Sequence, residues 1–230
     1  MVACLIVPTL LLASARAAAL PPKGAAAWVY DAKGGQPAMW SSNIAEFNTQ
    51  AANKGINTIW SYGGDMEQWS GKFYSYFTAQ SQQQATIYKN TTGVEYVVAV
   101  VDGRMDGKQT WSPDLSKLST AQVQQWADVT ADTYCSFQQI DGLQLDLEPF
   151  AAPYLDNLLL FLARLSANLR SPERNCVSPA HPDGRSLTTF LMAESATPAV
   201  WQALGPNGFL TISGCDQSGR LSRQPSTTNH

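Results

Sequence analysis

The sequence is poor in the residues on which most metal and nucleophilic sites depend. It contains two histidines and four cysteines in 230 residues, and no pair of cysteines has the spacing of metal ligands. Zinc sites are built from closely spaced cysteine and histidine, and serine-type nucleophiles rely on a histidine base. We therefore expect no metal site and no cofactor.

Charge of either sign is also scarce. Charged residues make up 14% of the chain, the net charge is −3, and no basic stripe or RNA-binding signature is present. A nucleic-acid partner is not expected, because such binding depends on clustered lysine and arginine. The pair Gly63–Gly64 has no third glycine and no helix opening behind it, which argues against dinucleotide binding.

The N-terminus is the longest apolar run, yet it is too short for a comfortable membrane span. Residues 2–19 are almost wholly apolar and end in the small residues around Ala15–Ala19, which offer sites to a signal peptidase. We expect residues 1–19 to be the signal peptide of a secreted or periplasmic protein with no stable membrane anchor. Because no lysine or arginine precedes the run, a hydrophobic N-terminus that is not cleaved is the alternative.

The chain does contain a regular alternation of strand-like and helical segments. Six segments have the apolar character of strands: 26–31, 56–64, 94–103, 141–150, 187–193 and 209–214. Helical patterns fall between them, from Ser42 to Gly55, from Ser119 or Thr120 to Tyr134, and from Pro153 to Ser171. These helices have capping residues or proline at their starts, and leucines recur at helical spacing in the last one. Strands joined by helices predict a parallel α/β sheet.

A parallel sheet forms either an open doubly wound layer or a closed barrel, and the placement of polar residues favours the barrel. Active sites of (β/α)8 TIM barrels lie at the C-terminal ends of the strands. Polar residues gather at those ends in this sequence: Tyr62, Asp65, Asp102, Arg104, Asp106, Asp146 and Glu148. We expect one barrel domain over residues 25–216.

The predicted barrel is short of strands. Six can be counted before residues 217–230, a polar segment without apolar periodicity that we expect to be disordered. A barrel without its last two strands has two unpaired edges, which soluble proteins normally avoid. Completion by another chain, an incomplete barrel, and a reading frame truncated or shifted after about Asp216 are the alternatives, and truncation is favoured.

The segment 141–150 carries the clearest chemical pattern. Three leucines alternate with Gln144, Asp146 and Glu148, so in a strand the polar side chains share one face at intervals of roughly 7 Å. Two carboxyls confined together disfavour double ionisation, and Glu148 is expected to keep its proton near neutral pH. Such an acid can protonate a glycosidic oxygen while a second group stabilises the developing positive charge. The alternative is structural, with both carboxylates capping strand ends or binding Arg104.

This segment resembles the fourth-strand signature of family 18 glycoside hydrolases, the chitinase-like barrels, which is Asp-x-x-Asp-x-Asp-x-Glu. Asp141, Asp146 and Glu148 match its first, third and last positions, and Gln144 stands in place of the middle Asp. The resemblance implies a retaining, substrate-assisted mechanism in which Glu148 protonates the leaving oxygen. Asp146 would orient the substrate's acetamido group, and Gln144 would hydrogen-bond Asp146 without adding charge.

Other features of the resemblance match less closely. The strand-six Tyr-Asp of the family corresponds to Cys215–Asp216, which lacks the phenol. The string 61–64, Ser-Tyr-Gly-Gly, is similar to the family's Ser-x-Gly-Gly but lies one strand early, and we interpret it as accidental. Glu148 followed by proline is also similar to cellulase-type barrels, which require a second carboxylate from a later strand. Glu194 is the candidate for that role.

Aromatic and polar side chains supply further candidate sugar contacts. Trp69 and Trp111 are expected in polar loops after the second and third strands, where they would be stacking platforms, whereas Trp60 and Trp126 are expected in the core. The remaining candidate substrate contacts are Tyr30, Tyr62, Asp102, Gln144, Glu194 and Asp216.

Two cysteines precede neighbouring strands. Cys135 closes the helix before segment 141–150, and Cys176 precedes the next strand, so both are expected at the rim opposite the active site. They are candidates for a disulfide, and two separately buried thiols are the alternative.

Two functions from different classes fit these patterns. The first is a secreted glycosidase that acts on a carbohydrate substrate, with Glu148 as the general acid and Asp146 as its partner. The second is a catalytically silent, lectin-like barrel that binds glycans through its aromatic residues. No pattern in the sequence specifies an oligomeric state.

Overall fold

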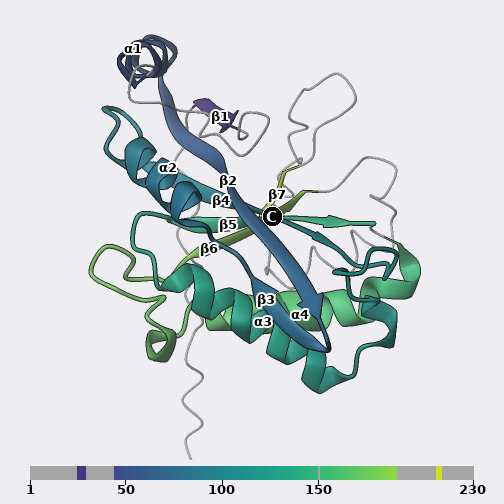
Figure 1. Cartoon of the computed structure of the whole chain (residues 1–230). Coiled ribbons are helices and arrows are strands. Elements are labelled where there is room, and N and C mark those ends of the chain that lie inside the picture. Colours follow the sequence, from purple (N-terminus) through teal and green to yellow (C-terminus); the bar gives the residue numbers. More distant parts are fainter. Residues whose placement is uncertain (1–24, 30–43, 150, 191–210, 214–230) are drawn as a thin grey trace, which may run out of the picture.

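The computed structural model describes residues 25–29, 44–149, 151–190 and 211–213, and these form a parallel sheet with helices packed against it (Figure 1). The strands are β1 Ala25–Val29, β2 Ile56–Trp69, β3 Lys72–Ser75, β4 Tyr96–Arg104, β5 Gly142–Glu148, β6 Ser186–Phe190 and β7 Thr211–Ser213. Six of them run parallel in the order β1-β2-β4-β5-β6-β7, and β3 pairs antiparallel with β2. The predicted α/β architecture with six parallel strands, an incomplete barrel, is confirmed.

Helices connect the parallel strands, as the alternating pattern predicts. They are α1 Ile44–Lys54, α2 Ala79–Lys89, α3 Thr120–Cys135 and α4 Leu155–Asn168, with short 3-10 turns η1 Leu115–Lys117, η2 Ala152–Tyr154 and η3 Pro172–Arg174. The helix α4 starts two residues after Pro153, because that proline lies in the turn η2 rather than in the first α-helical turn. None of the helices in the described ranges has both the length and the apolar character needed to cross a membrane.

Local capping explains where α3 begins. The Ser119 side chain accepts a hydrogen bond from the Gln122 backbone N–H, and the Gln122 side chain accepts one from the Ser119 backbone N–H. This reciprocal pair satisfies two donors that the first helical turn leaves without partners. The predicted start at Ser119 or Thr120 is therefore confirmed by a capping box.

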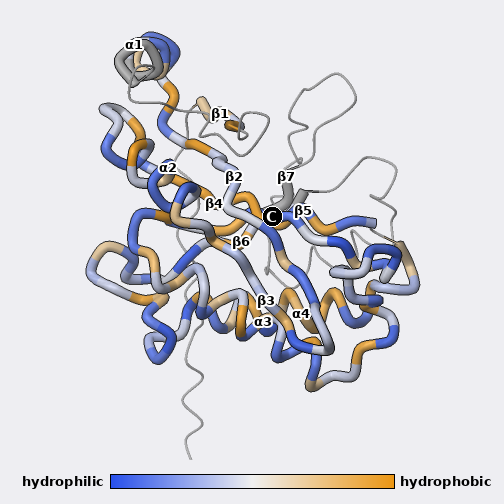
Figure 2. The backbone as a smooth tube through the Cα atoms, in the orientation of Figure 1, coloured by the Kyte–Doolittle hydropathy of each residue, from blue (hydrophilic) through white to orange (hydrophobic). Residues whose placement is uncertain are grey.

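The core lies between the sheet and the pair α3 and α4. These two helices lie side by side in Figure 1, and Figure 2 shows hydrophobic stretches in the strands and along α4. Trp126 of α3 is fully buried between Phe73 of β3 and Phe161 of α4, with ring centroids 5.7 and 5.1 Å apart. Burying an aromatic side chain of this size is among the largest single contributions to a core.

The strand β2 is longer than the segment 56–64 that the sequence predicts. It continues to Trp69 and turns back into β3 through Ser70 and Gly71, which both have positive φ as a tight hairpin turn requires. The register with β4 shifts between Tyr62 and Gly64. Gly64 has a φ of +121°, and an added Cβ there would lie 1.7 Å from the Tyr76 carbonyl oxygen. Trp69 is consequently the last residue of a strand, and its predicted placement in a loop is wrong.

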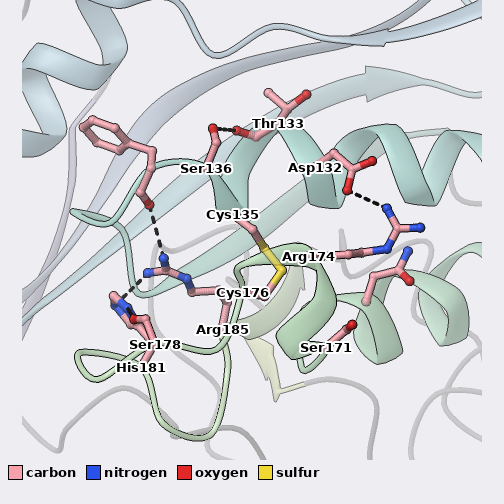
Figure 3. The surroundings of a disulfide bond; sticks show 12 residues. Asp132, Thr133, Cys135, Ser136, Ser171, Arg174, Cys176, Ser178, His181 and Arg185 are labelled. Atoms are coloured by element: carbon pink, nitrogen blue, oxygen red, sulfur yellow. Dashed lines mark hydrogen bonds and ion pairs between the residues drawn. A yellow bond between two sulfur atoms is a disulfide. The ribbon is translucent and has the colours of Figure 1, made fainter.

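A disulfide joins Cys135 at the end of α3 to Cys176 before β6, with their Cα atoms 4.6 Å apart (Figure 3). The bond spans 41 residues of sequence. Closing a loop of that length removes conformational entropy from the unfolded chain, which stabilises the fold by about 4 kcal/mol. In Figure 3, Arg185 points toward His181 and Arg174 toward Asp132, on opposite sides of this bond.

A buried charge network surrounds Asp141, which immediately precedes β5. Its carboxylate lies 2.7 Å from Lys89 Nζ and 2.9 Å from His181 Nε2, and it accepts a hydrogen bond of 2.8 Å from the Val97 backbone N–H. The Arg185 guanidinium lies 2.6 Å from the same His181 nitrogen, which can donate to Asp141 or accept from Arg185 but not both. This network ties α2, β4, β5 and the segment before β6 together at the N-terminal ends of the strands.

Candidate active site

A cavity of about 370 Å³ opens at the C-terminal ends of β2, β4 and β5, where a barrel places its active site. Its lining is strongly acidic and is formed by Asp65, Asp102, Gly103, Arg104, Trp111, Asp146 and Glu148. Six of these seven residues come from the three strands, and Trp111 comes from the segment after β4. The cavity therefore lies at the opposite end of the sheet from the Asp141 network.

Strand register brings three of the carboxyls into one row. Asp65 of β2 pairs with Asp102 of β4, and Asp102 pairs with Asp146 of β5. Neighbouring strands lie about 4.8 Å apart, so these side chains form a lateral line of carboxyls across the floor of the cavity. Two residues further along, Arg104 of β4 pairs with Glu148 of β5.

The polar face of β5 runs from the protein interior out to the cavity mouth. Gln144 is fully buried and its side-chain oxygen accepts a hydrogen bond from the Thr188 hydroxyl of β6. Asp146 is half-buried, and the Glu148 side chain is 50% exposed. Glu148 is thus the carboxyl most open to a ligand, whereas Gln144 lies beneath the cavity lining.

The electrostatics of the carboxyl row centre on Asp102. Burial, together with the nearby charges of Asp146, Asp65 and Glu148, raises the pKa of Asp102 to about 7. One of its oxygens, Oδ1, is buried with no hydrogen-bond partner among the described residues. Burial and the charge of Glu148 also raise the pKa of Asp146. Asp102 is therefore a member of the row whose pKa is raised toward neutral pH, which the sequence pattern does not predict.

Arg104 is shared unequally between two acidic partners. Its Nη2 donates to Asp106 Oδ2 at 3.1 Å, whereas its Nη1 is 3.9 Å from Glu148 Oε2. Asp106 also accepts from the Lys108 backbone N–H, and its side chain is nearly inaccessible. Arg104 is therefore anchored mainly by Asp106, and among the described residues its contact with the Glu148 carboxylate at 3.9 Å is the longer of the two.

The other predicted contacts fall at different distances from this cavity. Tyr62 donates a hydrogen bond of 2.7 Å to Asp65 Oδ2 from the strand β2, and burial together with Asp65 raises its pKa. Trp111 lines the cavity, and Trp69 lies at the far end of β2. The remaining predicted residues, Tyr30, Glu194 and Asp216, together with Cys215, lie outside the described residues.

Asp65 lines the cavity, but the sequence pattern places it only at a strand end and predicts no role for it in the site. The signal was present in its position, because Asp65 and Asp102 both follow apolar strand segments and neighbouring parallel strands end at one edge. The register shift between Tyr62 and Gly64 aligns Asp65 with Asp102, and that shift is a property of the folded sheet.

The raised pKa of Asp102 predicts a specific pH dependence of stability. A carboxyl with a higher pKa in the folded than in the unfolded chain stabilises the fold at low pH, and that stabilisation is lost as pH rises from about 4 to about 7. Asp102→Asn cannot ionise, so between pH 5 and pH 8 it should gain about 1–3 kcal/mol of unfolding free energy relative to the unmodified protein. Urea unfolding at both pH values measures this difference.

The matched control for this experiment is Asp156→Asn, at an exposed position in the first turn of α4. Its unfolding free energy should follow the unmodified protein across the same pH range. Parallel curves for Asp102→Asn and the unmodified protein would show that Asp102 does not hold a proton near neutral pH.

Solved chitinase structures resemble this fold. A family GH18 chitinase from Cycas revoluta, solved as a complex with allosamidin, superposes with a TM-score of 0.50 at 13% sequence identity, over 83% of this chain and 54% of the chitinase. A class V chitinase from Nicotiana tobaccum superposes with a TM-score of 0.51 at 11% identity, over 83% of this chain and 51% of the chitinase. The chain spans about half the length of the chitinases it matches.

Sequence comparison alone does not reveal this likeness. No protein-family model matches the sequence, and a search of curated proteins finds no relative. The likeness is carried by the order and direction of the strands and helices rather than by residue identity. The fold of this chain is that of the family 18 chitinase-like barrels, of which about six parallel strands are present.

Proposed function

We propose that this protein is a secreted or periplasmic glycoside hydrolase that cleaves a polysaccharide containing N-acetylhexosamine. The observation that carries the proposal is the position of Asp146 and Glu148, which lie on one face of β5 at the acidic cavity of a chitinase-like fold. Glycosidases use carboxyl groups placed in this way to donate a proton and to stabilise positive charge.

In this proposal Glu148 is the general acid and acts at the mouth of the cavity. Its half-exposed carboxyl can reach the oxygen of a glycosidic bond that lies across the ends of β4 and β5. Protonation of that oxygen makes the departing sugar a neutral alcohol, which lowers the barrier to bond cleavage. The anchoring of Arg104 by Asp106 supports this role, because the guanidinium then lies closer to Asp106 than to Glu148.

Asp146 lies deeper and acts on the other half of the reaction. As the bond to the leaving oxygen breaks, positive charge develops at the anomeric carbon and its ring oxygen. The carbonyl oxygen of the substrate's acetamido group attacks the anomeric carbon and forms an oxazolinium ion, which water then opens. Asp146 would hold the acetamido N–H and stabilise the cation, and the carboxyls of the row provide a negative field around it.

Asp102 would complete the site by sharing its proton with Asp146. The two residues are paired in register, and both line the cavity. A protonated carboxyl can donate a hydrogen bond to a neighbouring carboxylate, whereas two ionised carboxylates at that separation repel each other. Asp102 would therefore limit the negative charge of the row and orient Asp146.

Export is the part of the proposal that concerns location. It is supported by the disulfide between Cys135 and Cys176, since such bonds persist in oxidising compartments. The apolar residues 1–19 are the proposed signal peptide.

The proposal is tested by incubating the purified chain with soluble N-acetylglucosamine oligosaccharides and measuring both reducing ends and binding heat. We expect reducing ends to accumulate with time at a rate proportional to protein concentration. Saturable binding without any release of reducing ends would instead identify a lectin-like barrel and would end the hydrolase proposal.

A further inference from the structure

The β2–β3 hairpin carries an unusual concentration of exposed aromatic side chains. Trp69, Tyr74 and Tyr76 are 41%, 36% and 42% exposed, and among the described residues they are the large hydrophobic side chains that face solvent. Scattered single exposed residues need no explanation, but a contiguous aromatic patch on one element indicates a binding surface.

The three aromatic residues lie on one face of the hairpin. In the antiparallel register Glu67 is opposite Tyr74 and Trp69 is opposite Lys72, and residues opposite each other point to the same side of a sheet. Tyr76 follows two residues after Tyr74 and shares its side. We call the face formed by Glu67, Trp69, Lys72, Tyr74 and Tyr76 the hairpin face.

The opposite face of the hairpin is already used by the core. Met66 and Phe73 are buried, and Phe73 stacks on Trp126 of α3. The hairpin is therefore held in place from behind, and the hairpin face is not needed to attach it to the protein.

The hairpin face begins at the rim of the acidic cavity. The Tyr76 backbone N–H donates a hydrogen bond of 2.9 Å to the carbonyl of Asp65, a cavity residue. On the other edge of β2, the Gln68 backbone N–H donates one of 2.7 Å to the carbonyl of Trp111, which also lines the cavity. A polymer leaving the cavity along β2 would consequently cross the hairpin face.

Two contacts orient the aromatic rings of the hairpin face. The rings of Tyr74 and Tyr76 are nearly parallel, with an interplanar angle of 11° and centroids 6.0 Å apart. The Trp69 indole N–H donates a hydrogen bond of 2.6 Å to Glu67 Oε2, which fixes the orientation of that indole. Tyr74 is in β3 and Tyr76 follows the last residue of that strand, so their contact does not tie β3 to β2.

We propose that the hairpin face is a second saccharide-binding surface, which holds the polysaccharide chain outside the cavity. This inference rests on the proposed function for the identity of its ligand. The apolar C–H faces of pyranose rings pack on aromatic rings, and the phenol hydroxyls, Glu67 and Lys72 can hydrogen-bond the equatorial hydroxyls at the ring edges.

A saccharide chain fits this surface better than a protein partner does. The face is one hairpin wide and carries opposite charges at Glu67 and Lys72, whereas stable protein interfaces bury about 800 Å² on each partner around an apolar centre. A narrow aromatic strip bordered by hydrogen-bonding groups suits a narrow, hydroxyl-rich polymer.

The test uses the full chain with Tyr74→Ala/Tyr76→Ala and measures binding to chitin, together with hydrolysis of chitin and of its trisaccharide. Loss of two stacking rings is expected to weaken chitin binding about tenfold. The loss on the polymer should exceed the loss on the trisaccharide, because a trisaccharide in the cavity does not reach the whole hairpin face. Tyr74→Phe/Tyr76→Phe keeps the rings and should retain most of the binding.

The outcomes separate this inference from the proposed hydrolase activity. If the unmodified protein binds chitin through Tyr74 and Tyr76 but releases no reducing ends, the saccharide surface stands and the hydrolase proposal fails. If the alanine variant, shown by its thermal transition to be folded, binds chitin as the unmodified protein does, the saccharide surface is refuted. A change in oligomeric state in the alanine variant would overturn it in favour of a contact between copies of the chain.

Discussion

Glu148→Gln should lower the rate of glycosidic-bond hydrolysis by about 10²–10⁴-fold, the usual contribution of a positioned general acid. Glutamine has nearly the same shape and can still donate a hydrogen bond, yet it cannot release a proton to the leaving oxygen. Because Glu148 is at the mouth of the cavity and its side chain is 50% exposed, the substitution removes no buried contact. Binding of an unhydrolysed oligosaccharide should therefore stay within a few-fold of the unmodified value, as measured by calorimetry.

The rate is to be compared with that of Glu173→Gln, an exposed glutamate in η3 that contacts Ser171 and lies outside the cavity lining. That control should hydrolyse as fast as the unmodified protein. Undiminished hydrolysis by Glu148→Gln would mean that another carboxyl of the row is the acid, and Asp102, with its pKa of about 7, would be the next residue to replace.

Asp141→Ala should lower the free energy of unfolding by about 3–5 kcal/mol, the cost of removing one partner from a buried ion pair. Asp141 is 7% exposed, and its carboxylate accepts hydrogen bonds from Lys89 and the Val97 backbone N–H. Without it, the buried Val97 donor loses its acceptor, and Lys89 and the fully buried Arg185 lose a nearby negative charge. Urea or guanidinium unfolding at pH 7 measures the loss.

The pH dependence of the Asp141 effect distinguishes a charge network from simple packing. Burial opposes ionisation of Asp141, but hydrogen bonds from His181, Lys89 and Val97 outweigh it and lower the pKa of this carboxyl in the folded protein. A carboxyl with a lowered pKa stabilises the fold above its unfolded pKa, near 4, and loses that effect as pH falls through the folded value. The gap between the unmodified protein and Asp141→Ala should therefore narrow in acid.

Asp132→Ala is the matched control, because Asp132 forms an ion pair with Arg174 but its side chain is 59% exposed. Surface ion pairs contribute about 0–1 kcal/mol, so this variant should be nearly as stable as the unmodified protein. Equal losses in the two aspartate variants would contradict the buried-network account.

Asp141 and Glu148 also show how far a sequence motif can be read without the structure. Both match the family 18 signature, and they are only seven positions apart. A strand rises about 3.3 Å per residue, so the two carboxylates lie at opposite ends of β5. Glu148 lines the acidic cavity, whereas Asp141 holds Lys89 and His181 at the other end. The same short motif therefore contains Glu148, which belongs to the candidate active site, and Asp141, which stabilises the strand that carries Glu148.

Elements with local causes were predictable. The helix α3 begins where Ser119 and Gln122 form a capping box, and α1 ends before Gly55, which has positive φ. These signals act between residues a few positions apart, so no knowledge of distant contacts is needed. The hairpin after β2 had a local signal as well, in Ser70–Gly71, but the apolar pattern of β2 ends earlier and hides the continuation of the strand.

The sequence by itself determined the alternation of strands and helices and the placement of Asp146 and Glu148 on one face of β5, because both follow from periodicity along a single segment. The tertiary structure decided which residues join them. Asp65 and Asp102 enter the carboxyl row only through strand register, and the pKa of Asp102 depends on burial by residues far away in the sequence. Register and burial are set by contacts between segments, and a linear pattern does not contain them.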